Sequence, residues 1–177
     1  MVAAVSIRRV NALDRKLIDA LAEVLLDVVD GGASVGFMSP LTRDHAVAFW
    51  THVAASVDEG KRAIFIASDE QGVCGTVQLI LDLPDNQPHR ADLAKMLVHR
   101  RARRRGVGAA LLGAAEVSAR ETGKTLLVLD AVTDGDAARM YARHGWVRVG
   151  DIPNYALMPD GAPCSTTYFY RELRRDA

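Results

Sequence analysis

RRARRRGVGAALL, residues 100–112, is the stretch from which the fold of this 177-residue chain can be worked out. It follows a run typical of a β-strand, Ala91–Val98, and opens a run with helical spacing, Val107–Thr122. A strand, a glycine-containing turn and a helix in this order form the setting in which backbone amides bind phosphate. Gly106 and Gly108 remove side chains where a ligand must approach the backbone. The stretch therefore predicts an anion site at the first turn of the helix.

Arginine fills five of the six positions from 100 to 105. Arg103, Arg104 and Arg105 can add full positive charges to the partial charge of the helix dipole, which suits a pyrophosphate or a ribose phosphate. A nucleic-acid patch is the alternative, but such patches usually come with aromatic or further basic partners that are absent here. The glycine spacing does not fit a Rossmann loop, and no lysine follows for a P-loop.

The composition narrows the class of protein. The 22 basic and 22 acidic residues balance, so the overall charge does not attract nucleic acid. Apolar residues make up 49% of the chain, enough for one core, and we expect residues 1–177 to form one domain. Cys74 and Cys164 lack metal-ligand spacing, so we expect no metal site and a reducing, cytoplasmic location. No apolar run has the length of a membrane span, so we expect no membrane association.

The remaining patterns give the order of the elements. A strand at Val5–Val10 and a helix ending at Gly31 come first, and a second helix is expected with Ser39 as N-cap and Pro40 as its first residue. Later segments predict a β-hairpin and, around the arginine-rich turn, a βαβ unit with parallel strands. The sheet must therefore be mixed. The expected later elements are a hairpin at residues 63–69 and 73–81, strands at 91–98, 125–130, 146–151 and 165–173, and helices at 107–122 and 134–144.

Two segments carry a resemblance to a known family. Arg103-Arg104-Arg105-Gly106-Val107-Gly108 resembles the Arg/Gln-x-x-Gly-x-Gly/Ala signature of the GNAT N-acetyltransferases, and Ala138–Trp146, ARMYARHGW, resembles that family's second element. The resemblance implies an α/β (α+β) fold with a mixed, mostly antiparallel sheet of about seven strands flanked by four helices. It also implies acetyl-CoA as cosubstrate.

Residue by residue, the resemblance implies that the backbone of Leu97 and Val98 pairs with the pantetheine arm and that Tyr141 takes the place of the general acid. Arg100, Arg104 and Asp134 depart from the family pattern, which often has proline, glycine and asparagine there. Because the loop works through its backbone, the two arginines are compatible with it, whereas Asp134 is left out of the site. The amides implied to hold the pyrophosphate belong to Arg104, Arg105, Gly106, Val107, Gly108 and Ala109.

Acetyl transfer to an amine requires a group that accepts the ammonium proton and a group that protonates the departing thiolate. Asp92 lies in the strand before the turn and Asp130 ends the apolar run TLLVLD, so we expect both carboxylates at one crevice between neighbouring strands. Burial would make Asp130 a better base. An exposed strand start is the alternative for Asp92, and a core position is the alternative for Tyr141.

The glycine-rich stretch DGGASVGFMSP, Asp30–Pro40, follows a helix and contains no basic residue, so it is not a phosphate loop. Gly31 and Gly32 are expected to end the first helix. The part Asp30–Met38 of this stretch resembles a segment of the tabtoxin resistance acetyltransferases, as do Arg90-Ala91-Asp92, Leu129-Asp130 and Pro159-Asp160-Gly161. This resemblance implies Asp92 and Asp130 as paired carboxylates and part of the connection as the acceptor wall. The implied wall residues are Gly32, Ser34, Val35, Gly36 and Phe37.

The sequence thus predicts an acetyl-CoA-dependent N-acetyltransferase for a small-molecule amine, and the narrower expectation is an antibiotic or toxin amine of the tabtoxin type, whose acetylation gives resistance. We expect a monomer or homodimer that binds no nucleic acid. The alternatives are a protein or peptide N-acetyltransferase, and a non-catalytic module that senses CoA or binds nucleic acid through the arginines.

Overall fold

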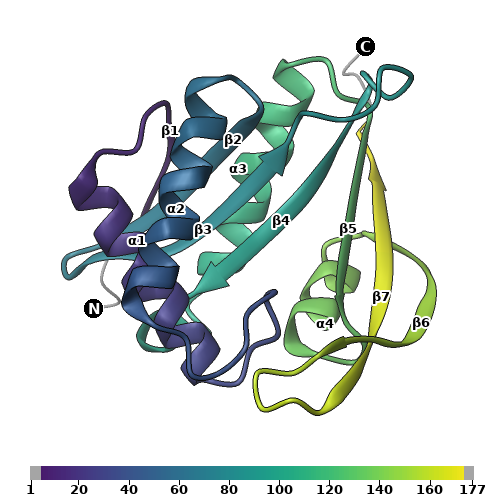
Figure 1. The fold of residues 1–177 in the computed structure, drawn as a ribbon. Helices are drawn as coiled ribbons and strands as arrows, with labels where there is room; N and C mark the ends of the chain where they lie inside the picture. Colours follow the sequence, from purple (N-terminus) through teal and green to yellow (C-terminus); the bar gives the residue numbers. More distant parts are fainter. Residues whose placement is uncertain (1–4, 174–177) are drawn as a thin grey trace.

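The computed structural model describes residues 5–173, whose strands form a single seven-stranded sheet (Figure 1). The strand order is β1-β2-β3-β4-β5-β7-β6. Neighbouring strands are antiparallel except β4 and β5, which are parallel. The mixed, mostly antiparallel sheet predicted from the sequence is therefore confirmed. The strands are β1 (Ser6–Val10), β2 (Arg62–Asp69), β3 (Gly72–Ile80), β4 (Arg90–Val98), β5 (Leu126–Val132), β6 (Val147–Leu157) and β7 (Pro163–Glu172).

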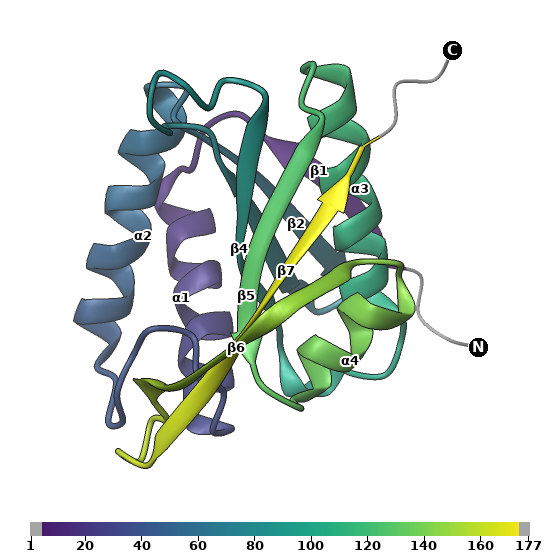
Figure 2. The ribbon, with the colours of Figure 1, turned by 90° about the vertical axis from the view of Figure 1, so that its right-hand side faces the viewer.

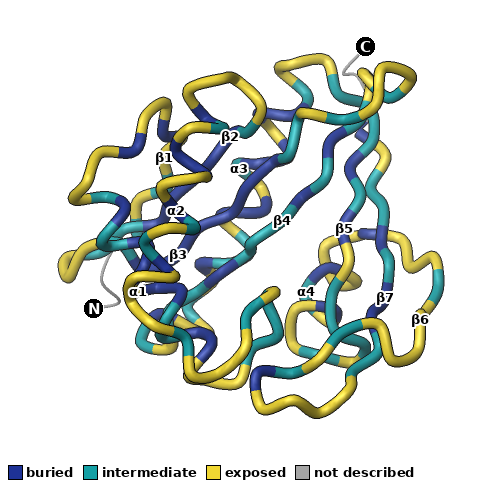
Figure 3. Tube along the Cα trace, viewed as in Figure 1, coloured by how far each residue is buried: buried dark blue, intermediate teal, exposed yellow. Residues whose placement is uncertain are grey.

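Two helices lie on each side of the sheet (Figure 2). The sheet separates two hydrophobic cores, one on each face. Ile64 and Ile66 of β2 are buried in the core with α1 and α2, whereas Phe65 between them is buried in the core with α3 and α4. Figure 3 shows this burial along the central strands and the exposure of β6. None of the helices within residues 5–173 has the length and apolar composition needed to cross a membrane. The helices are α1 (Arg15–Asp30), α2 (Arg43–Asp58), α3 (Val107–Glu121) and α4 (Asp136–Arg143), with a 3-10 turn at Arg100–Ala102.

The ends of the first two helices test the capping predictions. Gly31 follows α1, and Gly32 has a φ of +83°, a left-handed conformation that glycine adopts easily, so the predicted helix end is confirmed. The predicted start of the second helix at Ser39–Pro40 is wrong. Thr42 is the N-cap instead, because its hydroxyl accepts a 3.2 Å hydrogen bond from the amide of His45.

Three later boundaries also differ from the predictions. β5 continues past Asp130 to Val132 because its ladder with β7 runs on to the pair Val132 and Thr166. α4 begins at Asp136 rather than Asp134, whose φ of +58° is incompatible with a right-handed helix. β6 extends to Leu157 because it stays paired with β7 beyond the expected end at residue 151. Pairing with β7, which local periodicity does not contain, sets the two strand ends, whereas the backbone conformation of Asp134 sets the start of α4.

A bulge in β4 exchanges the faces of its side chains. Leu93 and Leu97 would share a face in a regular strand, yet Leu93 belongs to the α3 and α4 core and Leu97 to the α1 and α2 core. The register with β3 shifts between Thr76 and Gln78, and Lys95 in the shifted segment has a φ of +51°.

The parallel pairing of β4 with β5 is short. It joins Arg90 to Leu126, Ala91 to Leu127 and Asp92 to Val128, and ends there. Both strands continue, β4 to Val98 and β5 to Val132, and they separate as they do so (Figure 1). The edge of β4 that faces β5 is thus unpaired with β5 beyond residue 92, which leaves backbone groups available to an extended ligand.

Candidate active site

The first turn of α3 has the backbone arrangement that anion binding requires. Gly106 is the N-cap with a φ of +77°, and no side chain caps the helix. The first intrahelical bond runs from the amide of Ala110 to the carbonyl of Gly106, so the amides of residues 107–109 have no acceptor within the helix. Nothing lies within 4 Å of a Cβ atom built on Gly106. The predicted phosphate-binding turn is therefore open at its glycine.

Gly108 is required for a different reason than expected. A Cβ atom built there would lie 2.9 Å from Sδ of Met140, which is closer than real contacts allow. The missing side chain therefore allows α4 to pack close to the start of α3, and Gly106 alone supplies the unusual backbone conformation.

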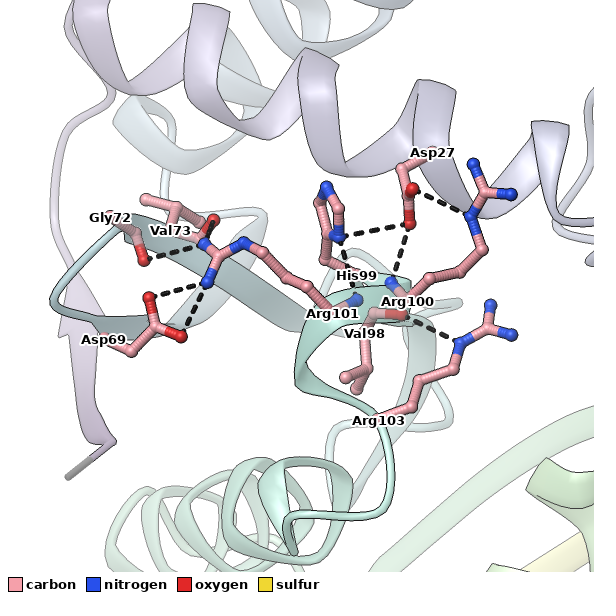
Figure 4. Close-up of polar contacts among 9 residues, drawn as sticks. All are labelled: Asp27, Asp69, Gly72, Val73, Val98, His99, Arg100, Arg101 and Arg103. Carbon is pink, nitrogen blue, oxygen red and sulfur yellow. Dashed lines mark hydrogen bonds and ion pairs between the residues drawn. The ribbon is translucent and has the colours of Figure 1, made fainter. Parts of the chain in front are cut away.

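The arginines of the turn divide into two groups, the first of which holds the loop in place (Figure 4). Arg101 donates to both oxygens of Asp69 at 2.7 and 2.6 Å, and Arg105 donates to the same carboxylate at 3.2 Å. Hydrogen bonds from Arg101, together with the amide of Gln71 and with Arg105, outweigh desolvation and lower the pKa of Asp69.

A second ion pair fixes the loop to α1. The backbone amide and Nε of Arg100 donate to the carboxylate of Asp27 at 2.7 and 2.9 Å (Figure 4). Burial of Asp27 opposes its ionisation, but Arg100 and His99 outweigh burial and lower its pKa. Arg100, Arg101 and Arg105 are thus each paired with a carboxylate of the protein, and Arg101 and Arg105 share that of Asp69. The sequence predicted that Arg105 adds positive charge at the anion site, but its side chain is directed towards the β2–β3 turn, where it contacts Asp69.

Arg103 and Arg104 form the second group and are exposed. Nε of Arg103 donates to the carbonyl of Val98 at 3.3 Å, and Arg104 has a φ of +59°. Both guanidinium groups act on Asp136 at the start of α4, whose pKa is lowered first by Arg139 and then by Arg104 and Arg103. These two arginines therefore stand on the α4 side of the turn.

Asp92 and Asp130 lie on adjacent strands, on the same face and two residues apart in register, since Asp92 is paired with Val128. The register offset corresponds to about 6.6 Å along the strand. Across the strands the two residues are further apart than a paired couple, because β4 and β5 separate beyond Asp92 and Val128 (Figure 1). Asp92 forms an ion pair with Arg90. Asp130 accepts a 2.9 Å hydrogen bond from the hydroxyl of Thr166. The expected burial of Asp130 is wrong, because this residue is exposed even though β5 is paired with β7 there.

Two tyrosines from the last hairpin stand beside these carboxylates. Tyr168 is the β7 partner of Asp130, and its hydroxyl lies 3.0 Å from the hydroxyl of Tyr155. The hydrogen bond with Tyr155, desolvation and the negative charges of Asp130 and Asp92 raise the pKa of Tyr168 to about 12. Both carboxylates thus act on one hydroxyl, which supports their placement at one site.

Tyr141 lies on the packed face of α4 and is 4% exposed. Its ring contacts Trp146 and Phe169, with centroid distances of 5.7 and 6.1 Å. Burial first, and then the charge of Asp130, raises the pKa of Tyr141 far above the usual tyrosine value. The hydroxyl therefore stays protonated across the physiological range.

The connection between α1 and α2 reaches across the end of the sheet to the β6–β7 hairpin (Figure 1). The hydroxyl of Ser34 donates to the carbonyl of Leu157 at 3.1 Å, and the amide of Ser39 donates to the carbonyl of Pro159 at 2.9 Å. Phe37 packs edge-on against Phe49 of α2 at 5.1 Å. Hydrogen bonds thus hold this connection, the wall, against the β6–β7 hairpin. The wall includes the predicted substrate residues Gly32, Ser34, Val35, Gly36 and Phe37.

Sequence reasoning missed one side chain at this wall. Nζ of Lys95 lies 5.9 Å from the ring centroid of Phe37 and 5.7 Å from that of Phe49. A strand of regular period gives no sign of this position, because the β4 bulge determines where Lys95 points. The positive charge contrasts with the carboxylates of Asp92 and Asp130 nearby.

Comparison with known proteins fits this geometry. The sequence profile of the acetyltransferase (GNAT) domain matches residues 60–148, half of the chain. The protein belongs to the GNAT acetyltransferase family. The matched GNAT region begins before β2 and ends in β6, so it contains the split between β4 and β5, the turn before α3, and Tyr141.

Solved structures agree with the GNAT fold over nearly the whole chain. A putative acetyltransferase from Salmonella typhimurium, solved with acetyl-CoA, is 19% identical with a TM-score of 0.77, covering 98% of this chain and 96% of that chain. A putative phosphinothricin N-acetyltransferase is 18% identical with a TM-score of 0.77, covering 97% and 99%. A ribosomal-protein-alanine N-acetyltransferase from Brucella melitensis is 18% identical with a TM-score of 0.78, covering 95% and 99%. The names of the last two proteins give different acceptors, so the GNAT fold alone does not define what is acetylated.

Proposed function

We propose that this GNAT protein is an N-acetyltransferase that transfers the acetyl group of acetyl-CoA to the amine of a small molecule. One observation carries the proposal: the β4–β5 ladder ends at Asp92 and Val128, which leaves the rest of β4 unpaired with β5, and the helix that follows β4 begins with an uncapped N-terminus. Carboxylates lie at this opening, and a protonated tyrosine follows on α4.

The residues present fit acetyl-CoA, which was bound in the Salmonella structure and which supplies a thioester whose acetyl group can be transferred. The amides of residues 107–109 and the αL conformation of Gly106 suit a pyrophosphate. Arg103 and Arg104 add positive charge beside it, and the amide groups of residues 104–106 complete the turn. The unpaired edge of β4 at Leu97 and Val98 suits an extended pantetheine arm.

Asp130 is the proposed general base. Its Oδ2 is oriented by the hydroxyl of Thr166, whereas the charge of Asp92 is already balanced by Arg90. A carboxylate held by one neutral hydroxyl retains its ability to accept a proton, directly or through a water molecule. Asp92 would then hold the ammonium group of the acceptor before it loses its proton, so the two carboxylates have different tasks.

Tyr141 is the proposed general acid. It is buried on α4, close enough to Asp130 for that charge to raise its pKa, and it therefore carries its proton at neutral pH. Packing against Trp146 and Phe169 fixes its ring. Tyr141 can thus hold a proton for the thiolate that leaves when the acetyl group is transferred.

The wall from Gly32 to Phe37, which is hydrogen-bonded to the β6–β7 hairpin, favours a compact acceptor. Hydrogen bonds from Ser34 and Ser39 to the β6–β7 hairpin close this side of the site, whereas a polypeptide acceptor needs an open groove. An antibiotic or toxin amine of the tabtoxin type is the narrower form of the proposal. Its support is the sequence resemblance at residues 30–38, 90–92 and 129–130.

The ion pairs of the turn argue against the nucleic-acid alternative. Arg100 is paired with Asp27, and Arg101 and Arg105 share Asp69, so the five-arginine run does not present five unpaired guanidinium groups to a polyanion.

Calorimetric titration with acetyl-CoA, followed by thiol release with a panel of amines, tests the proposal. We expect binding to be lost in Gly106→Glu and retained in Gly60→Glu, a matched change at another positive-φ glycine with open surroundings. Small amines should release thiol faster than peptides of equal concentration. Absence of acetyl-CoA binding to the unaltered protein would refute the function, and turnover of peptides alone would refute the acceptor class.

A further inference from the structure

Lys95 occupies an unusual position for a charged side chain. It lies within the β4 bulge, with a φ of +51°, where the register against β3 shifts. The bulge is what directs Lys95 towards the connection between α1 and α2 rather than along the regular alternation of the strand. A bulge of this kind changes the direction of a side chain, and here the side chain concerned is that of Lys95.

Two aromatic rings and the backbone of Gly36 lie close to the ammonium of Lys95, a half-buried residue. Its Nζ lies within 6 Å of two ring centroids, those of Phe37 and Phe49, at 5.9 and 5.7 Å. These two rings meet edge to face, with centroids 5.1 Å apart. On another side, a Cβ atom built on Gly36 would lie 3.4 Å from Nζ. The aromatic faces attract the cation but cannot neutralise it.

Within residues 5–173, no carboxylate lies within 4 Å of Nζ of Lys95. Desolvation and the positive charge of Arg62 lower the pKa of Lys95, and the negative charge of Asp130 opposes them. Charged side chains that are withdrawn from water are usually paired, because an unpaired charge there costs free energy. The described residues thus leave this ammonium with more desolvation than compensation.

The neighbouring strands add donors rather than acceptors. The guanidinium of Arg62 donates to Oε1 of Gln78 at 2.6 Å, which occupies that oxygen. Gln78 is fully buried, and its Nε2 has no hydrogen-bond acceptor among the described residues. Gln78 is paired with Ala94, the residue before Lys95. Positive charge and hydrogen-bond donors therefore predominate on this part of the sheet, while the carboxylates stand on β5 and at the start of β4.

We propose that Lys95 is an anion-binding residue of the acceptor site and that the acceptor carries a carboxylate in addition to its amine. This inference rests on the proposed function and deepens it. The amine would lie near Asp92 and Asp130, and the carboxylate near Lys95, so the site separates its charges as an amino-acid-like molecule does. A single ammonium suits a singly charged carboxylate, and the aromatic rings of Phe37 and Phe49 exclude water from the pair.

Matched acceptors test the inference. An α-amino acid, its primary amide and the corresponding amine without the carboxyl carbon share one amine but differ in the negative charge. For the unaltered protein we expect kcat/KM to be highest for the acid. In Lys95→Met we expect kcat/KM for the acid to fall roughly 10- to 100-fold, mainly through KM, with little change for the amide. Lys95→Arg should retain part of the preference for the acid.

Three controls separate the possible results. Lys61→Met changes an exposed lysine that pairs with Glu59, and it should leave the acid-to-amide ratio unaltered. Acetyl-CoA affinity by calorimetry should be equal in Lys95→Met and the unaltered protein, which also demonstrates folding. Equal loss for acid and amide in Lys95→Met, or an unaltered protein that prefers the neutral amine, would overturn the inference while the proposed function stands. Acetyl-CoA binding without turnover of any amine would overturn both.

Discussion

Thr166 of β7 donates a 2.9 Å hydrogen bond to Oδ2 of Asp130 on β5, and Thr166 is itself only 4% exposed. The same hydroxyl lies 3.0 Å from the carbonyl of Ala131. Asp130 is exposed, yet one of its oxygens is fixed in this way. The orientation of the proposed base therefore depends on the strand that β5 gains as a neighbour, not on the βαβ unit that precedes it.

Replacing Asp130 by asparagine keeps the shape of the side chain and removes its ability to accept a proton. We expect kcat for amine acetylation to fall about 100- to 10,000-fold, while the dissociation constant of acetyl-CoA changes little. Thr166→Val should lower kcat by a smaller factor because the carboxylate loses its orientation but not its charge. Steady-state kinetics and calorimetry measure these effects, and an unchanged kcat in Asp130→Asn would remove it from catalysis.

Tyr141→Phe removes a hydroxyl and leaves the packing against Trp146 and Phe169 intact. We expect turnover to fall about 100-fold without a change in acetyl-CoA affinity, because the thiolate loses its proton donor. A general acid must be protonated, so activity is lost only as pH rises through its pKa. Since burial raises that pKa, the alkaline limb assigned to Tyr141 should lie above pH 10, the ordinary tyrosine value.

The pH profile provides the contrary outcome for Tyr141. A limb below pH 10 that disappears in Tyr141→Phe would contradict the buried, protonated hydroxyl. The same shift affects stability: a tyrosine with a raised folded-state pKa stabilises the protein below about pH 10, and this contribution is lost as pH rises further. The unfolding free energy of the unaltered protein should therefore decline above pH 10 more steeply than that of Tyr141→Phe.

Much of the fold could be predicted because helix periodicity, alternating strands and the glycines of the α3 turn are local signals. The functions of the arginines could not, because Arg100 pairs with Asp27 and Arg101 with Asp69, which are 73 and 32 residues away. The position of Lys95 depends on the β4 bulge, which shifts the register without a glycine or proline to mark it. The exposure of Asp130 depends on which elements cover β5, and adjacent Leu and Val do not determine that.

Asp69→Asn should destabilise the protein, because Asp69 is 2% exposed at its side chain and serves both Arg101 and Arg105. We expect a loss of about 1–3 kcal/mol in the unfolding free energy at pH 7. The affinity for acetyl-CoA should fall as well, since these bonds hold the turn before α3 against the β2–β3 hairpin. Denaturant unfolding and calorimetry measure the two effects.

The sign of the pH dependence follows from the lowered pKa of Asp69. Its contribution is present above the unfolded-state value of about 3.9 and is lost as pH falls through the lower folded-state pKa. The difference between Asp69→Asn and the unaltered protein should therefore shrink below pH 4. Glu59→Gln, which alters an exposed pair with Lys61, serves as the control and should have little effect. Equal stability of Asp69→Asn at pH 7 would contradict a role in fixing the turn.

Two glycines of the α3 region should respond to alanine with opposite signs. Gly106 has a φ of +77° and open surroundings, so Gly106→Ala introduces backbone strain and should cost about 1 kcal/mol. Gly113 lies inside α3, is exposed and has no atom within 4 Å of a built Cβ, so Gly113→Ala should stabilise by about 0.5–1 kcal/mol. Thermal or denaturant unfolding gives both values. If Gly106→Ala left stability unchanged and acetyl-CoA still bound with its original affinity, the left-handed N-cap would not be what shapes the anion site.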